Sequence, residues 1–596
     1  MRKQLWIIIL LMMWVVQWAV SIVGTLPTSR MPWQEGWLAM ENLAYLVAYQ
    51  ANRRWFWPSP RSSSRRRGRR GKRPPPRRTE TPAGEDENAE KKPKPGQMSD
   101  GQPDAQNDTV SAPHRWGLSP EMSQGLPERL YGFWQRFAEC FKTKTRNTSE
   151  YAYHYLSGLL RLETKRNYTN IGRATDVAGE NMQHFMSNSP WSAEVVLDQV
   201  LREIKATPSL EQGSVLILDE SADQSGGKMA GAGRQYNGRL GKVEMSQVGT
   251  FLGYANLTDV NRPLCTWVDG ELYLPQSWFV PDKAEERKRV GIPPDRQFET
   301  KIELGWKMIQ RVMAKELPFD AVACDDLYGQ STRLRDQLNG AGLIYIADVP
   351  RTTQVYLEKP VLGVPEPVPG RRGPKPTRLR VLNGVQPLKA HQVARRADTL
   401  WKPVRVRAIE RGELTDPFAA RLVWTLREGK PEPVQEWLVM RRETKKRCTY
   451  SLSNTPADTP LAYLAWLKCQ RYFVERANQN AKSEAGWDEL QAQKYRGWIH
   501  HLALVLLAVW FLAQTRWEWA QQYARDPTLA HQFELSVLPA LSMANVRLLL
   551  RAAMPLPQPT PEEAVLLVVG HLVNRTRSRK SRLKRQRATY NANAPP

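Results

Sequence analysis

Cysteine is scarce in this chain of 596 residues, and its five cysteines lie far apart in the sequence. They are Cys140, Cys265, Cys324, Cys448 and Cys469. No two of them form a CxxC pair, and none has a histidine at metal-ligand spacing. This pattern argues against a disulfide framework and a structural zinc site, and it favours a reducing compartment. Cys324, which stands beside Asp325, is interpreted as a buried strand residue rather than as a nucleophile.

Acidic residues are also fewer than basic ones. The chain has 86 Lys and Arg against 60 Asp and Glu, which gives a formal net charge of +26. An excess of this size predicts a polyanionic partner, either nucleic acid or an anionic membrane surface. The length is sufficient for roughly two to four domains with their own cores.

A long apolar run at the N-terminus stands against a purely nucleic-acid interpretation. Residues 5–26 carry no charge, and Arg2 and Lys3 precede them, as in a transmembrane helix or a signal anchor. Two interpretations of residues 1–26 remain open. They form a membrane anchor, or they are a spurious extension upstream of a later start such as Met122.

Residues 27–118 have the composition of a disordered basic, proline-rich linker. Arg53–Arg78 contains twelve basic residues and no acidic ones. Such a segment cannot bury enough apolar surface to fold. A solvated linker is favoured over a non-specific nucleic-acid arm, because the aromatic residues within Arg53–Arg78 are confined to 55–57. A second basic run, Arg575–Arg587, carries eight basic residues within the predicted C-terminal helical region and tail, 521–596.

Residues 119–205 show a helical period. Leu130, Phe133, Trp134 and Phe137 recur at i, i+3, i+4 and i+7, which predicts an amphipathic helix. We interpret this segment as a helical domain that binds DNA ends, although an all-helical domain has many other uses.

Residues 211–350 alternate strands and helices. The short apolar run Ser214–Leu218 predicts a buried strand that ends abruptly at Asp219, and a glycine-rich loop follows it. The later elements are predicted strands at Gln247–Leu257, Leu264–Leu274 (with a turn at Asp269-Gly270), Ala321–Cys324 and Leu343–Ala347, and helices at Lys301–Lys315 and Ser331–Leu338. This is the element order of an RNase H-like mixed sheet, an α/β fold whose first and fourth strands are neighbours. Asp219 and Asp325 are therefore expected to meet at the ends of their strands.

Residues 351–455 depart from this alternation and predict a β-rich insertion. Strand-like runs occur at Val404–Ile409, Ala420–Leu426 and Gln435–Met440. The helical period returns in residues 456–520, with one helix predicted at Leu461–Glu484 and another at Leu490–Gln514. The apolar stretch Leu502–Leu512 is short for a membrane span and is expected to pack in the core.

A third acidic candidate lies in the first of these helices. Arg471, Glu475 and Lys482 are spaced by four and seven residues, so they share one helix face. The alternative interpretation is a surface ladder of ion pairs.

Taken together, these motifs resemble a known family. The stretches LILDES…RQYNGRLGKVEMSQVGTFLGYA, VACDDLYG and RYFVERANQNAKSEAGWDELQAQKYRGWIHH are similar to insertion-sequence DDE transposases of the IS-four-like group. The resemblance spans roughly Glu121 to Thr515. It implies an RNase H-like core with a β-rich insertion, and it places the catalytic, metal-binding carboxylates at Asp219, Asp325 and Glu475.

Two departures from the family pattern are visible. The signature Y-x2-R-x3-E-x6-K is met by Arg471, Glu475 and Lys482, but Lys468 stands at the tyrosine position. Glu220-Ser221 follows the first aspartate, where the family tends to have Asp-Thr.

The chemistry of phosphodiester cleavage explains why three carboxylates are needed. Two divalent cations about 3.5–4 Å apart serve the in-line displacement, one at the nucleophile and one at the leaving oxygen. Mg²⁺, for which Mn²⁺ can substitute, prefers carboxylate oxygens. Asp219 would bridge both ions, with Asp325 and Glu475 on one each. Mutual repulsion would leave the site poorly formed without metal or DNA.

Basic residues are expected to position the DNA. Arg471 and Lys482 would hold phosphates beside the scissile bond. Further candidates for the same channel are Lys228, Arg234, Arg239 and Lys242, for which a solvated basic hairpin is an equally open interpretation. Glu220 and Asp326 are expected to point away from the site, because side chains alternate along a strand. At least one of His500 and His501 is expected to pack between helices.

The predicted function is a DNA transposase that binds terminal inverted repeats, cleaves a strand and uses the freed 3′-OH to attack target DNA. It would act as a homodimer on DNA in the cytoplasm, associated with the nucleoid. The alternatives are a decayed or domesticated DNA-binding derivative and a membrane-anchored basic protein.

Overall fold

The computed structural model describes residues 110–592, apart from 225, 239, 260–262, 367–376, 410–411, 445, 491, 536 and 559. The apolar run at 5–26, the basic run Arg53–Arg78 and Arg239 lie outside the described residues. The predictions made for them stay predictions.

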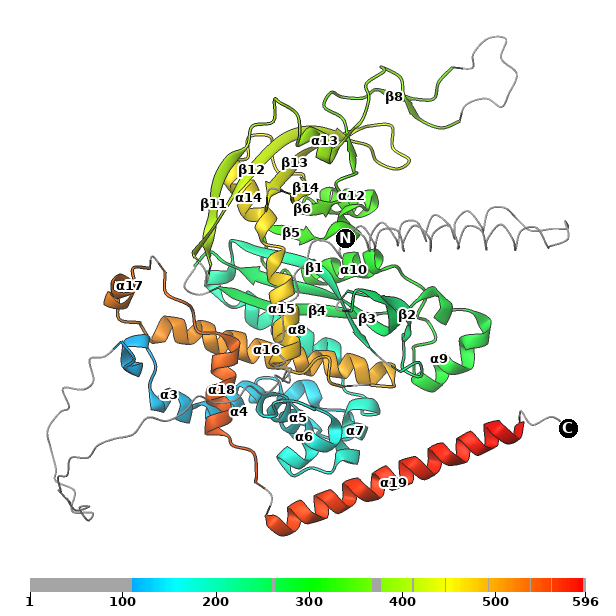
Figure 1. Cartoon of the computed structure of the whole chain (residues 1–596), viewed down its shortest axis with the longest axis vertical. Coiled ribbons are helices and arrows are strands. Elements are labelled where there is room, and N and C mark those ends of the chain that lie inside the picture. Colours follow the sequence, from blue (N-terminus) through cyan, green and yellow to red (C-terminus); the bar gives the residue numbers. More distant parts are fainter. Residues whose placement is uncertain are drawn as a thin grey trace, which may run out of the picture. The chain divides into compact units, whose positions relative to one another are not determined.

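One mixed sheet of ten strands organises the fold (Figure 1). Its core part contains β1 (Ser214–Gln224), β2 (Gly233–Asn237), β3 (Lys242–Asn256), β4 (Leu264–Tyr273), β5 (Ala321–Cys324) and β6 (Ile344–Val349). β1 pairs antiparallel with β3 and parallel with β5, and β5 pairs parallel with β6. The predicted RNase H-like mixed sheet is therefore confirmed, including the adjacency of its first and fourth strands.

Three local predictions in this sheet were wrong. β1 does not end at Asp219 but continues to Gln224, because β3 goes on pairing with it beyond the end of β5. β2 forms a hairpin with the start of β3 where a loop was expected. Asp269-Gly270 is not a turn but lies within β4, where the buried Asp269 carboxylate pairs with Arg311 of α10 (Lys301–Ala314) at 2.8 Å.

The β-rich insertion is confirmed, and it extends the core sheet. Its main strands are β11 (Lys402–Ile409), β12 (Gly412–Thr425), β13 (Val434–Arg442) and β14 (Cys448–Ser453), and β14 pairs antiparallel with β6. Short strands β7 (Gln354–Val355), β8 (Leu362–Gly363), β9 (Arg380–Val381) and β10 (Leu388–Lys389) form two small two-stranded sheets, β7 with β10 and β8 with β9, and helix α13 (Ala390–Val393) follows them. Core and insertion are thus joined by a continuous hydrogen-bonded ladder (Figure 1).

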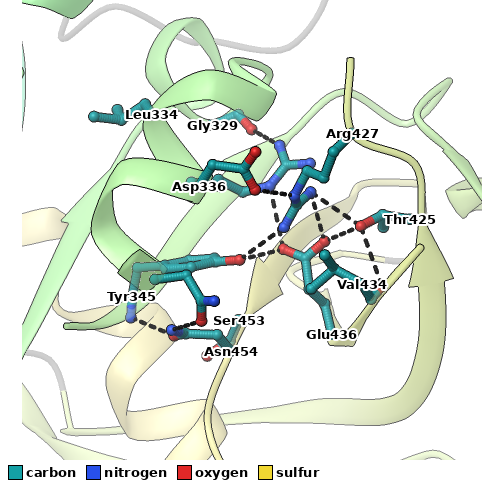
Figure 2. Close-up of polar contacts among 12 residues, drawn as sticks. Gly329, Leu334, Asp336, Tyr345, Thr425, Arg427, Val434, Glu436, Ser453 and Asn454 are labelled. Atoms are coloured by element: carbon teal, nitrogen blue, oxygen red, sulfur yellow. Dashed lines mark hydrogen bonds and ion pairs between the residues drawn. The ribbon is translucent and has the colours of Figure 1, made fainter. Parts of the chain in front are cut away.

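A buried polar network reinforces this join (Figure 2). Glu436 of β13 accepts a hydrogen bond from the Tyr345 hydroxyl of β6 at 2.5 Å, and it pairs with Arg335 and Arg427 at 3.1 Å each. Arg335 belongs to α12 (Thr332–Gly340) and also donates to the Gly329 carbonyl at the end of α11 (Asp326–Gly329). The insertion is therefore linked by ion pairs and hydrogen bonds to the part of the core that follows Asp325.

The predicted helical region before the sheet consists of α3 (Pro120–Gln124), α4 (Leu126–Gln135), α5 (Ser149–Arg161), α6 (Tyr168–Thr175), α7 (Gly179–Ser187) and α8 (Ala193–Lys205). Their apolar residues share one hydrophobic core with α16 (Tyr495–Gln522) and with β4. His500 and His501 of α16 lie in this core: His500 Nδ1 is 2.9 Å from the Met186 carbonyl oxygen, and His501 Nδ1 is 3.0 Å from the Tyr155 hydroxyl. The prediction that at least one of them packs between helices is confirmed.

The helices after the insertion differ from prediction in their bounds. α16 spans Tyr495–Gln522 rather than Leu490–Gln514. Among the described residues it is the one helix that is long and apolar enough to cross a membrane, but 89% of its most apolar window is buried inside the protein. Leu502–Leu512 is buried throughout, as expected for a core helix.

The predicted single helix at Leu461–Glu484 is two helices, α14 (Leu461–Cys469) and α15 (Tyr472–Ser483). At the joint, the amides of Phe473 and Val474 bond to carbonyls three residues back rather than four. No glycine or proline marks this break in the sequence. The remaining helices are α9 (Ala284–Val290), α17 (Thr528–Gln532), α18 (Met543–Ala553) and α19 (Pro561–Ala592), and the basic run Arg575–Arg587 belongs to α19.

Candidate active site

Strand register places Asp219 and Asp325 side by side. Leu218 and Cys324 form the last residue pair of the parallel β1–β5 ladder, and each aspartate follows directly. Asp325 leaves the strand as the N-cap of α11, and its Oδ1 accepts hydrogen bonds from the amides of Leu327 (2.9 Å) and Tyr328 (3.4 Å). Among the described residues, β1 has no strand partner on this side beyond Leu218, at the point where the carboxylates gather.

A third carboxylate joins them, and it is not the predicted one. Asp219, Glu220 and Asp325 each offer a ligand oxygen, and these oxygens all lie within 4.8 Å of one another. We call these three residues the carboxylate cluster. The expectation that Glu220 points away from the site is therefore wrong.

The packing of β1 explains why alternation did not exclude Glu220. Gly253, opposite Ile217, leaves room for Val474 of α15, so the odd-numbered side chains of β1 face that helix. Leu218 packs against Gly305 of α10, so the even-numbered side chains face α10, where Lys301 pairs with Glu220 at 3.5 Å. Asp219 and Glu220 thus leave opposite faces, and their carboxylates still converge on Asp325 because β5 ends between them.

The carboxylate cluster is electrostatically strained. Burial, followed by the negative charge of Glu220, raises the pKa of Asp219 to about 7. Burial and the charges of Glu220 and Asp219 raise the pKa of Asp325 well above its usual range. Arg471 opposes both shifts without cancelling them. Like charges held together in this way favour either a bound proton or a bound cation.

Glu475 lies beside the carboxylate cluster but not within it. Its Oε1 pairs with Nη2 of Arg471 at 2.8 Å, and its negative charge contributes to the raised pKa of Asp219. The structure therefore brings two of the three predicted catalytic carboxylates together and holds the third on a neighbouring arginine.

Asn478 is a site residue that the sequence analysis missed. Its Nδ2 donates to Oδ2 of Asp219 at 3.1 Å, and its Oδ1 accepts from the indole of Trp267 at 2.9 Å. The Trp267 bond fixes which end of the amide faces Asp219, because indole is only a donor. Spacing could have indicated this residue, since Asn478 stands between Glu475 and Lys482 on the same face of α15.

The basic candidates divide into two groups. Arg471, the N-cap of α15, and Lys482, in its last turn, flank Glu475, and Lys482 pairs with Asp223 of β1 at 3.2 Å. Arg234 lies opposite Met245 on β3, six residues from Phe251, the partner of Asp219, which is about 20 Å along a strand. Lys242 lies farther along the same strand and pairs with Glu244 at 2.8 Å, and Lys228 is exposed in the turn before β2. Among the described residues of the β2–β3 hairpin, Arg234 and Lys242 therefore do not lie beside the carboxylates.

The residues present fit a divalent cation. Hard cations such as Mg²⁺ take carboxylate oxygens as ligands, and all three cluster members supply them. Glu220 Oε2 is a buried oxygen without a hydrogen-bond partner among the described residues. Such an oxygen is costly to bury unless a ligand satisfies it.

Comparison with known proteins bears on the same part of the chain. A family model described as DDE superfamily endonuclease matches residues 136–413, which include Asp219 and Asp325 but not Glu475. The chain is also 27% identical over 194 residues to a probable transposase for insertion sequence element IS701 from Microchaete diplosiphon. That match covers 30% of this chain and 45% of the relative, so the chain spans less than half of the relative's length. The resemblance to insertion-sequence DDE transposases that the motifs predict is thereby confirmed.

Proposed function

We propose, from the premise that this chain is a relative of insertion-sequence DDE transposases, that it cleaves DNA at the terminal inverted repeats of its element and joins the freed 3′ ends to target DNA. The observation that carries the proposal is the placement of Asp219 and Asp325 directly after the last β1–β5 pair, with a third carboxylate within 4.8 Å. The family match spans both aspartates.

Asp219 and Asp325, with Glu475 as the third catalytic carboxylate, would hold two Mg²⁺ ions, or Mn²⁺ in their place. When bound, these ions supply Lewis acidity to the attacking and leaving oxygens of the phosphodiester. The chain itself orients the reactants. Asn478 fixes the Oδ2 side of Asp219, and the N-cap bonds of Asp325 fix its carboxylate.

Glu475 would join Asp219 and Asp325 by an exchange of ion pairs. Arg471 neutralises Glu475 in this structure at 2.8 Å. A DNA phosphate at the site competes for the same guanidinium, which binds phosphate and carboxylate with the same geometry. Release of Glu475 then coincides with the arrival of substrate, so the complete carboxylate set assembles on DNA.

Basic residues away from the carboxylates would hold the flanking duplex. Lys482 would contact the phosphate backbone near the site, and Lys228, Arg234, Arg239 and Lys242 would contact it farther out, without reading sequence. Two ends must be brought together for joining, which calls for a homodimer on DNA. The protein would act in the cytoplasm, on the nucleoid.

The test is strand cleavage by the full-length protein of a labelled duplex that carries the inverted repeat flanking its gene. We expect cleavage with Mg²⁺ or Mn²⁺ and none in EDTA. Asp219→Asn, Asp325→Asn and Glu475→Gln should each abolish cleavage, whereas Asp326→Asn, the matched neighbour of Asp325, should cleave within about threefold of wild type.

A decayed or domesticated derivative makes a different prediction. It is favoured by Lys468 at the family's tyrosine position and by the engagement of Glu475 with Arg471. Specific binding of the duplex without cleavage at any divalent ion would establish that alternative. Recovery of the protein in the membrane fraction, with no affinity for the duplex, would instead favour the membrane-anchored alternative and overturn the proposal.

A further inference from the structure

Asp348 of β6 stands at the centre of a second polar group, which has no part in the predicted catalytic set. Its Oδ1 accepts from Nζ of Lys468 at 3.0 Å and from the Ser451 hydroxyl, and its Oδ2 pairs with Nε of Arg471 at 3.2 Å. Burial raises the pKa of Asp348, but Lys468 and Arg471 outweigh it, so that the pKa is lowered. Asp348 is therefore held ionised between two cations.

Arg471 links this group to the active site. Its Nε forms an ion pair with Asp348, and its Nη2 donates a hydrogen bond to Glu475, so one edge of the guanidinium faces two carboxylates. Nη1 has no hydrogen-bond partner among the described residues. A guanidinium has a rigid planar fork of donors, so anchoring one edge fixes the direction of the other.

Lys468 accounts for the remaining charge of Asp348. Only 3% of its side chain is exposed, and its Nζ contacts Asp348 and Ser451. Two cations, Lys468 and Arg471, thus face two carboxylates, Asp348 and Glu475. Lys468, which departs from the family signature, therefore contributes a buried counter-charge to this polar group.

We propose that Asp348 is a positioning residue for Arg471, which it orients so that Nη1 meets the DNA phosphate beside the carboxylate cluster. The inference rests on the proposed function, since it assigns to Asp348 the placement of the residue that binds substrate phosphate. Lys468 balances the charge that this arrangement buries. In this role Asp348 itself contacts neither the substrate nor a metal ion.

The first part of the test is a double-mutant cycle of Asp348→Asn and Arg471→Lys in the full-length protein. Single-turnover cleavage should fall about 10²-fold in each single variant, the loss typical of a misplaced catalytic group. The double variant should fall no more than about threefold further, because both changes remove the same orientation. Asp416→Asn, which removes a half-buried carboxylate from Arg441 in the insertion, is the matched control and should cleave as wild type does.

The second part separates orientation from stability. Asp348→Asn leaves Lys468 buried without its counter-charge, so Tm should fall. Lys468→Met added to Asp348→Asn should restore Tm, while the cleavage rate stays about 10²-fold low. Affinity for the same duplex in EDTA should fall by an equal factor in Asp348→Asn and Arg471→Lys.

Recovery of wild-type cleavage by the Lys468→Met pair, or multiplication of the two losses to about 10⁴-fold in the cycle, would overturn the positioning role. Absence of cleavage by the wild type would count against the proposed function instead. In that case unequal losses of metal-free affinity in Asp348→Asn and Arg471→Lys would overturn the inference separately.

Discussion

Two acidic centres in this protein, one fully buried and one partly buried, have opposite electrostatics. Glu436, between the core and the insertion, faces Arg335 and Arg427 and accepts from the Tyr345 hydroxyl (Figure 2). Burial raises its pKa, but the two guanidinium groups outweigh burial and lower it. In the carboxylate cluster the same burial acts beside other carboxylates, and the pKa of Asp219 rises to about 7.

The two centres differ in the source of the positive charge that balances their carboxylates. Around Glu436 the chain supplies it, and the centre is complete without any ligand. In the carboxylate cluster the chain gathers negative charge, and no hydrogen bond from the described part of the chain reaches Glu220 Oε2. A completed ion network holds a fold together, whereas an uncompensated one is a binding site for a cation.

The largest expected effect is on catalysis. Asp325→Asn should reduce single-turnover cleavage by about 10³-fold or more, because the charge that holds the cations is removed. Its Tm should stay at or above the wild-type value, since a repelling charge is lost. A fall in both quantities together would mean that Asp325 serves the fold rather than the reaction.

Glu436→Gln should show the converse pattern. Removal of the carboxylate leaves two buried guanidinium groups facing a neutral amide, so the free energy of unfolding should fall by about 3–5 kcal/mol. Denaturant unfolding measures this change. Material that remains folded should keep its cation affinity, and loss of cation binding without loss of stability would break the comparison.

Divalent cations should stabilise one centre and not the other. At a cation concentration 100 times the dissociation constant, the wild type should gain about 2.7 kcal/mol of unfolding free energy. Asp219→Asn and Asp325→Asn should lose this gain, and Asp416→Asn should retain it. Thermal unfolding with Ca²⁺ or Mg²⁺ against EDTA is the measurement.

The pH dependence of stability in EDTA should follow the raised pKa values. Between about pH 4 and pH 7 the folded protein keeps protons on Asp219 that the unfolded chain has lost, so stability should fall as pH rises across this window. Asp219→Asn should flatten the decline, as should a saturating cation. A rise of stability with pH that Asp219→Asn alone abolishes would contradict the assignment.

The smallest effect is expected on the β2–β3 hairpin. Arg234→Ala should weaken DNA binding uniformly across sequences and reduce the slope of log affinity against log salt by about 1. Cleavage of bound DNA should be unchanged, because Arg234 lies far along the sheet from Asp219. Anisotropy titrations at several salt concentrations give the slope.

The insertion and the part of the chain that precedes it also differ in charge. Residues 351–447, most of the insertion, contain 22 basic and 10 acidic residues, whereas residues 110–350 contain 28 basic and 30 acidic ones. The positive excess therefore resides largely outside the part of the core that holds Asp219 and Asp325. Composition of the whole chain indicated a polyanionic partner without showing this division.

Prediction from the sequence was most successful where local pattern decides structure. The apolar runs before Asp219 and Asp325 are short and buried, and the order of the strands and helices around them, that of an RNase H-like sheet, predicts that they are neighbouring strands. Prediction was least successful where contacts between residues far apart in the sequence determine the structure. The break before Tyr472, the convergence of Glu220 on Asp325 and the bond from Asn478 to Asp219 leave no mark in the local pattern.

The order of strands and helices, and with it the meeting of Asp219 and Asp325, was determined by the sequence alone, because hydrophobic periodicity and strand connection are local properties of a chain. The state of charge around each carboxylate was decided only by the tertiary structure. Coulomb energies depend on distances between residues far apart in sequence, such as Arg335 and Glu436 or Asp348 and Arg471. Those distances are set only when the chain has folded.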